Sequence, residues 1–402
     1  MRTAVLWGIF TVAVVAGPAG AVAQEAQAPT REATIEEAQA EKVKDLHPYV
    51  ENKAERVIDR LENAIINGPP RWHPFFDSAY AGGGFTFGAG YAHHLSSYNL
   101  LDVRGSYTIT GYKRVEAELV MPELFSRRGT LSLLGGWREA TEVGFYGLGT
   151  DTSKDDRTNY DFKRPYASGL LTIHPTRRNL LLRAGLEWTQ WSQHPGHGSF
   201  PSVERVFTPA TLPGLDATAT YLHTQATVGF DWRTTPGYTR RGGYYGVTGH
   251  DYHDRDGRFG FQQVDYEAIQ HFPILREAWV ISLHGLVQTA FDKDDQQTPF
   301  FMLPALGGGS SLRGYSSWRF RDQNSLLLQA EWRIMVNRFF DSAVFYDAGK
   351  VTARTSDLDL KNLKSDFGFG IRFHSPISTP IRLELARGNE GLTFIFSASP
   401  VF

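Results

Sequence analysis

The sequence predicts an all-β protein: a transmembrane antiparallel β-barrel of sixteen strands, preceded by a short N-terminal periplasmic helix. From residue 71 to the C-terminus, segments of about ten residues alternate apolar and polar side chains and are separated by turn residues, as in the strands of membrane barrels. After an N-terminal export signal, no apolar stretch is long enough for a membrane helix. We therefore expect any membrane span to be built from strands that close on themselves.

The composition excludes several classes of protein. The 41 basic and 43 acidic residues give a net charge of −2, so we expect no nucleic-acid partner. Cysteine is absent, which excludes disulfides and thiol chemistry and is compatible with an oxidising compartment. The motifs of nucleophilic, nucleotide-binding and zinc enzymes are absent too. We expect no enzyme activity, cofactor or metal; the histidines and aspartates of residues 250–254 fit a strand end better than a metal site.

Residues 1–23 have the pattern of a secretory signal peptide. Arg2 supplies the positive start and residues 4–15 the apolar run, and the small residues Ala21, Val22 and Ala23 precede the cleavage point.

Residues 24–70 are expected to form a periplasmic tether and an amphipathic helix. Within 34–66, apolar residues recur every three, four or seven positions and make one stripe among charges: Val43, Leu46, Val50, Val57, Leu61 and Ile65. Pro48 interrupts the helix, and the Asn-Gly-Pro-Pro sequence of residues 67–70 ends it. A packed linker, a plug and a helix that binds an unidentified periplasmic partner all remain open.

The alternation is clear in single segments of the barrel region. In 179–190, one face holds Leu180, Leu182, Ala184, Leu186 and Trp188, and the other holds Arg183, Glu187 and Thr189. A soluble β-sandwich also alternates. Here, however, the polar face mixes charges with glycine and the apolar face ends in aromatic residues, as an aromatic girdle would.

Counting such segments gives the strand number. Fifteen are clear, and because bacterial single-chain barrels have an even number, we add 72–80 as the first strand to make sixteen. The others are 83–92, 100–110, 112–122, 130–147, 160–174, 179–193, 218–233, 242–254, 259–274, 278–291, 325–336, 339–352, 363–375, 380–387 and 391–402.

Connection lengths predict the orientation. Short connections, such as 174–178 and 376–379, are expected to be periplasmic turns, and long ones, 148–159, 193–217 and 292–322, to be external loops. The last is rich in glycine and aromatic residues, and we expect it to be ordered and folded inward.

One arginine stands out in that loop. Arg313 lies beside Gly314 and Tyr315, shortly after a run of three glycines. In the strand that follows, 325–336, the polar face carries Glu331. An arginine on a flexible loop and a carboxylate on the inner face of the next strand are natural partners.

Several motifs resemble one family. Leu312-Arg313-Gly314-Tyr315 after a glycine run resembles the [V/L]RG[F/Y] motif of the BamA/TamA-like outer-membrane superfamily, also called bacterial surface antigens. Residues 345–351, FYDAGKV, resemble its F-x-D-x-G-x-V strand, and 367–372 with 381–386 resemble its closing strands. Residues 145–149, FYGLG, resemble a segment near an early loop.

The resemblance implies a sixteen-stranded barrel whose sixth external loop folds inward. Its arginine then pairs with acidic residues of the inner wall, so that Arg313, Gly314 and Tyr315 form a loop lock with Glu331 and Asp347. The alternative is an ordinary interior ion pair that only stiffens the barrel.

The resemblance also implies a function at the bacterial outer membrane: assisting the insertion or transport of protein or lipid. Its expected partners are outer-membrane lipid and, during biogenesis, the barrel-assembly machinery. Residues 24–70 show only a helical pattern, with neither the POTRA domains nor the lipase domain of some members, so we expect a stand-alone barrel. A diffusion pore and, less so, an outer-membrane hydrolase are the alternatives.

The chain ends are expected to meet. Phe394, Phe396 and Phe402 have even spacing and resemble the C-terminal signal by which barrels are recognised. We expect 72–80 to pair with 392–402 in a weak seam, because Pro74 and Pro400 remove ladder donors.

Overall fold

The computed structural model describes residues 31, 35, 70–175, 179–275, 277–337, 339–375, 379, 381–397 and 401–402. The chain divides into two compact units, 1–58 and 59–402, and the second holds the sheet. The expected signal peptide, tether and N-terminal helix lie outside the described residues, apart from Arg31, Ile35 and Pro70.

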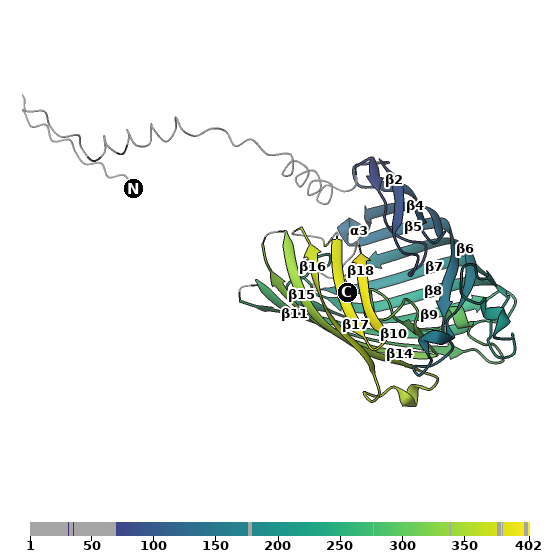
Figure 1. The fold of residues 1–402 in the computed structure, drawn as a ribbon. Coiled ribbons are helices and arrows are strands. Elements are labelled where there is room, and N and C mark those ends of the chain that lie inside the picture. Colours follow the sequence, from purple (N-terminus) through teal and green to yellow (C-terminus); the bar gives the residue numbers. More distant parts are fainter. Residues whose placement is uncertain are drawn as a thin grey trace, which may run out of the picture. The chain divides into compact units, whose positions relative to one another are not determined.

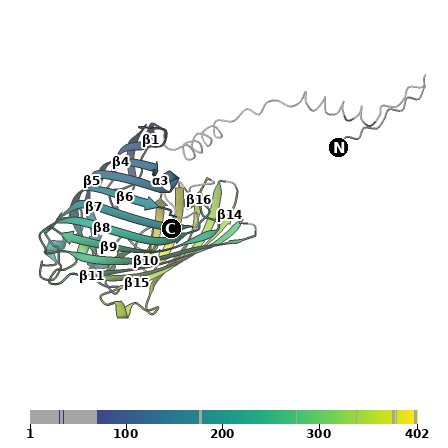
Figure 2. The same ribbon diagram turned by 180° about the vertical axis from the view of Figure 1, so that it is seen from behind.

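Sixteen antiparallel strands form one sheet, in which each strand pairs with the next along the chain. The sheet curls round on itself (Figures 1 and 2). This confirms the expected all-β barrel fold. The strands are β1 (Trp72–Pro74), β2 (Thr86–His94), β3 (Leu100–Thr108), β4 (Lys113–Glu123), β5 (Gly129–Phe145), β6 (Thr158–Ile173), β7 (Leu180–Pro195), β8 (Thr218–Asp231), β9 (Gly242–Asp254), β10 (Phe261–Ile274), β11 (Trp279–Asp292), β14 (Asn324–Met335), β15 (Phe340–Thr352), β16 (Lys364–Phe373), β17 (Ile381–Gly388) and β18 (Gly391–Ser397).

The remaining elements are short and lie in the connections. They are the pair β12 (Ala305–Leu306) and β13 (Phe320–Arg321), the helix α3 (Leu124–Arg127), and the 3-10 turns η1 (Lys154–Asp156), η2 (Val203–Arg205), η3 (Phe300–Met302) and η4 (Thr355–Asp357). Among the described residues, no helix has the length and apolarity needed to cross a membrane.

The two faces of the sheet are the reverse of those of a soluble protein. On β16, Phe367, Phe369 and Ile371 are 53–60% exposed, whereas Asp366 and Arg372 are 1% and 4% exposed. Apolar side chains therefore point outward and polar ones inward along the same strand, which suits a sheet whose outer face meets lipid.

The first strand differs from the expectation. Only Trp72–Pro74 joins the sheet, paired with Ala89 to Tyr91 of β2. Beyond it, Phe75 lies 5.2 Å from the guanidinium carbons of Arg104 and Arg114. The expected strand 72–80 is therefore wrong after Pro74, although the count of sixteen is right.

The segment of residues 75–84, called here the inner segment, continues along the polar inner face of the sheet. Asp77 forms an ion pair with Arg114 of β4, and the Tyr80 ring meets Phe162 edge-on at 4.8 Å. Gly82 and Gly84, with φ of 98° and 72°, then turn the chain back into β2. Such angles favour glycine and do not occur in a regular strand.

The expected pairing of 72–80 with 392–402 is not found among the described residues. Among the strands that the structure describes, β1 is paired with β2, and β18 is paired with β17. The two edges still approach each other, because the rings of Phe85, just before β2, and Phe396 of β18 lie 6.4 Å apart.

One end of the sheet carries the long connections and is called here the loop end; the other is the turn end. At the loop end an apolar cluster packs inside the barrel. It combines strand residues such as Phe162, Trp191 and Tyr221 with Leu212 of the β7–β8 loop and Phe300 of η3.

Candidate functional site

The connection between β11 and β14 enters the barrel. Its central part, residues 305–321, is called here the inner loop. β12 and β13 pair at its base, and Gly307 and Gly308 there have φ of 116° and 99°, which glycine adopts without strain. Apolar packing then holds the loop against the inner wall, through Leu306, Leu312, Tyr315, Phe320, Leu327 and Val351.

Arg313 of the inner loop has no exposed surface. Its Nε and Nη2 donate to the two carboxylate oxygens of Asp347 on β15, at 2.6 and 2.7 Å. Its Nη1 donates to Glu331 of β14 at 3.2 Å and to Glu384 of β17 at 3.3 Å. The guanidinium carbon also lies 3.4 Å from the ring centroid of Phe345. The bidentate contact of Arg313 with Asp347 is the strongest form of an arginine–carboxylate pair.

The electrostatics favour a permanently charged Arg313. Burial alone would lower its pKa, but the hydrogen bonds and charge of Asp347, with the charges of Glu331 and Glu384, raise the pKa above its usual value. The cation is therefore matched by carboxylates within the barrel, which a buried charge requires.

Two further arginines complete a buried network. Arg372 of β16 donates to both oxygens of Glu331 and, at 2.9 Å, to Glu384. Arg382 of β17 donates to Glu384 at 2.7 Å and, at 3.2 Å, to the backbone oxygen of Gly309 in the inner loop. The network therefore joins β14, β15, β16 and β17 to the loop.

Gly314 and Tyr315 place the loop against β16 and β17. A Cβ at Gly314 would lie 2.5 Å from the Asp366 Cβ and 2.6 Å from the Gly388 backbone nitrogen, so only glycine fits. Tyr315 is 2% exposed, and its hydroxyl donates to the backbone oxygen of Ser365 at 3.2 Å.

On its other side, the inner loop contacts the inner segment, which lies at the first-strand edge of the sheet. Trp318 Nε1 donates to the backbone oxygen of Ala81 at 3.0 Å, and its ring stacks on Tyr80 at 4.3 Å. Towards β18, a Cβ at Gly309 would be 3.0 Å from the Ile395 side chain. The inner loop thus lies behind the gap between β18 and the first strands and touches both sides.

The structure brings together Arg313, Glu331 and Asp347, as the sequence suggested, with Gly314 and Tyr315 beside them. Their role as a lock stays a prediction. The sequence reasoning did not assign Glu384, Arg372 or Arg382 to the site. All three nevertheless lie on polar faces of alternating segments, which is the signal that could have identified them.

The C-terminal residues do not share one face. Phe394 and Phe396 point outward, 65% and 48% exposed. Phe402 lies inside, with its ring 5.0 Å from His284 and 6.2 Å from His271. Phe402 lies beyond β18, which ends at Ser397, and the C-terminal barrel signal stays a prediction.

Comparisons with known proteins agree with this architecture. Among solved structures, BamA from Haemophilus ducreyi lacking POTRA domains 1–3 is similar, with a TM-score of 0.60 and 17% identity over 81% of this chain and 68% of that one. CdiB from Escherichia coli has a TM-score of 0.54 and 11% identity, over 82% of this chain and 60% of that one. CdiB from Acinetobacter baumannii has a TM-score of 0.52 and 11% identity, over 78% and 56%.

This chain therefore spans less than two thirds of either CdiB chain. A comparison with curated protein sequences finds no match. The model of the Omp85 superfamily domain matches residues 77–399, which hold all but the first of the sixteen strands and the whole Arg313 network. The chain is a member of the Omp85 superfamily.

Proposed function

We propose that this protein is a bacterial outer-membrane barrel that inserts or transports protein or lipid by opening between β18 and the first strands, and that it is not an enzyme. One observation carries the proposal: two neighbouring sheet edges share no ladder in the described part of the chain, and an arginine-anchored loop bridges them from inside.

Unpaired edges facing lipid are costly. Backbone groups that have no partner in hydrocarbon destabilise a barrel, so an incoming strand could be accepted at the edge of the sheet formed by β1 or β18. The inner loop could control such an opening, because it is attached on both sides of the seam. On one side it is held by the network of Arg313 and by the ion pair of Arg319 with Glu390. Towards the inner segment it is held by one hydrogen bond and one ring stack of Trp318. The Trp318 side is the weaker and should separate first.

The interior argues against a diffusion pore. The apolar cluster fills the loop end with large side chains, among them Phe145, Phe162 and Phe300, each at most 1% exposed. The inner loop and the Arg313 network occupy the region next to it. A wide pore needs a water-filled path through the barrel, and these buried side chains argue against one.

The test is to lock the seam. Phe85→Cys and Phe396→Cys would place two thiols at the approaching edges of this cysteine-free chain, for joining by a short bis-maleimide. The control pair, Val344→Cys and Phe369→Cys, lies on directly paired residues of β15 and β16 and should be harmless when joined.

We expect the joined seam pair to lose function in cells that depend on this protein, while the folded barrel survives in gels of unheated samples. If the joined seam and the joined control support such cells equally, lateral opening is wrong. A large steady conductance in planar bilayers would instead favour the diffusion pore.

A further inference from the structure

The connection between β8 and β9 does not behave like an ordinary surface turn. It spans residues 232–241 at the turn end, yet Tyr238 and Thr239 are only 5% and 4% exposed. The Tyr238 hydroxyl donates to Asp341 of β15 at 2.6 Å. Its ring stacks on His374, just after β16, with the centroids 4.1 Å apart and the planes 7° from parallel.

Other contacts fix the backbone of the same turn. Arg333 of β14 donates to the oxygen of Thr239, and the Thr379 hydroxyl donates to the oxygen of Gly237 at 3.2 Å. Arg240 reaches the sulfur of Met335 at 2.8 Å. In the sheet order, β10 and β11 separate β9 from β14. The turn therefore crosses the interior to reach a distant part of the wall.

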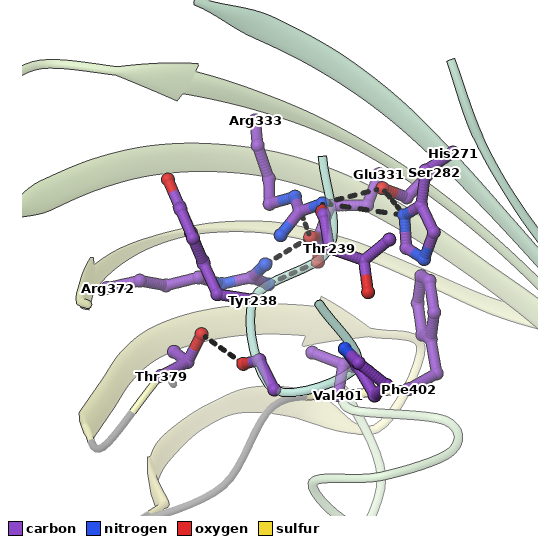
Figure 3. Close-up of a pocket in the computed structure, with 12 residues that line it drawn as sticks. Tyr238, Thr239, His271, Ser282, Glu331, Arg333, Arg372, Thr379, Val401 and Phe402 are labelled. Atoms are coloured by element: carbon purple, nitrogen blue, oxygen red, sulfur yellow. Dashed lines mark hydrogen bonds and ion pairs between the residues drawn. The ribbon is translucent and has the colours of Figure 1, made fainter. Parts of the chain in front are cut away.

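The C-terminus enters the same space. The Phe402 ring packs against Leu181, Tyr244 and Ile269 on β7, β9 and β10. Figure 3 shows Val401 and Phe402 beside Tyr238 and Thr239, around a small cavity that they share with His271 and Ser282. Its volume of about 10 Å³ holds one water molecule at most.

We propose that residues 232–241, together with Val401 and Phe402, form a displaceable plug that closes the turn end of the barrel, and that its removal exposes the interior as far as the Arg313 network. We call these residues the turn-end plug. The contacts of the turn-end plug are of a kind that can break and form again. The turn is held by hydrogen bonds and one ring stack, which can be exchanged for water, rather than by a continuous apolar core.

Tyr238 is the central contact of the turn-end plug. Burial, and then the hydrogen bond and charge of Asp341, raise the pKa of its phenol. The hydroxyl therefore stays a donor to Asp341 throughout the physiological range. Removing the hydroxyl deletes this bond and leaves the ring stack; removing the whole side chain deletes both.

Thiol labelling tests the turn-end plug directly. Ser282→Cys places a reporter at a position that is 1% exposed and lines the shared cavity. The purified barrel in lipid nanodiscs is treated with a charged methanethiosulfonate. Ser282 lies near the start of β11 (Trp279–Asp292), at the turn end, so the rate of labelling reports access from that end. Labelling is compared in the reporter alone and with Tyr238→Phe, Tyr238→Ala or Phe402→Ala added.

We expect slow labelling of the reporter alone, about tenfold faster labelling with Tyr238→Ala or Phe402→Ala, and an intermediate rate with Tyr238→Phe. The matched control is Tyr245→Ala. Tyr245 lies on β9 but is 44% exposed, and its hydroxyl bonds to Gln270 at 2.6 Å; the rate should not change.

Equal rates in all variants, or fast labelling of the reporter alone, would overturn the plug. Folding of each variant is checked by its gel mobility before and after heating. If Tyr238→Ala does not fold, Tyr238→Phe and Phe402→Ala decide the question. No client molecule takes part in the experiment, so its result is independent of the proposed function.

Discussion

At the scale of single residues, we expect substitution of Arg313 to have the largest effect on stability. Arg313→Ala leaves the buried carboxylates of Asp347, Glu331 and Glu384 without their shared cation. Breaking a buried pair in this way typically costs about 3–5 kcal/mol. We expect the inner loop to detach and become cleavable by external protease. Arg354→Ala is the control, because that side chain is 78% exposed and pairs with Asp357 at the surface. Equal protection in the two variants would argue against the lock.

Gly314 allows a second test at this scale. Gly314→Ala drives a methyl group into Asp366 and the backbone of Gly388, and such overpacking typically costs about 1–3 kcal/mol. We expect the temperature at which the barrel loses its unheated gel mobility to fall. Gly249→Ala is the matched control, because no atom lies within 4 Å of a Cβ there. A fall of the same size in both would show that Gly314 is not a close-packed contact.

The residues of the site were only partly predictable. Arg313 and Asp347 belong to short motifs, and Glu331 follows from alternation in one strand. Glu384 meets Arg313 across 71 residues of sequence, and no local pattern selects it from the other inward charges. The contacts that define the network are set by the curvature of the sheet, which alternation does not reveal.

At the scale of elements, Trp318 should hold the inner segment at the first-strand edge of the sheet. Trp318→Ala removes the hydrogen bond to Ala81 and the stack on Tyr80, and leaves the Arg313 network intact. We expect faster amide hydrogen exchange in the inner segment (residues 75–84), because both contacts are made to it. Trp332→Ala is the control, because this tryptophan is 41% exposed and stacks on Trp279 outside the barrel. Unchanged exchange in Trp318→Ala would mean that the loop does not hold this edge.

Strands were the most predictable elements, because lipid outside and polar groups inside impose a period of two on each of them. The inner segment was not predictable. Trp72, Pro74 and Phe76 continue an apparent alternation, and the partners that draw residues 75–84 inside, such as Arg114 and Trp318, lie far along the chain.

At the scale of the whole molecule, the barrel interior is obstructed in two places: by the apolar cluster at the loop end and by the turn-end plug. We expect no steady conductance above the background in planar bilayers. Tyr238→Ala alone should not change this, because the loop end stays filled. Combining it with deletion of residues 307–319 should open a conducting path. A conducting wild-type protein would contradict the closed interior.

The way the chain enters the sheet has a mechanical consequence. β1 is joined to β2 by only three residue pairs, compared with fourteen between β10 and β11. Tension applied upstream of residue 70 would therefore peel β1 away before any other strand. The load would next fall on residues 75–80, and through Tyr80 on the Trp318 ring. A pull on the N-terminal side would thus be delivered to the weaker attachment of the inner loop, at the opposite end of the barrel wall from where the force is applied.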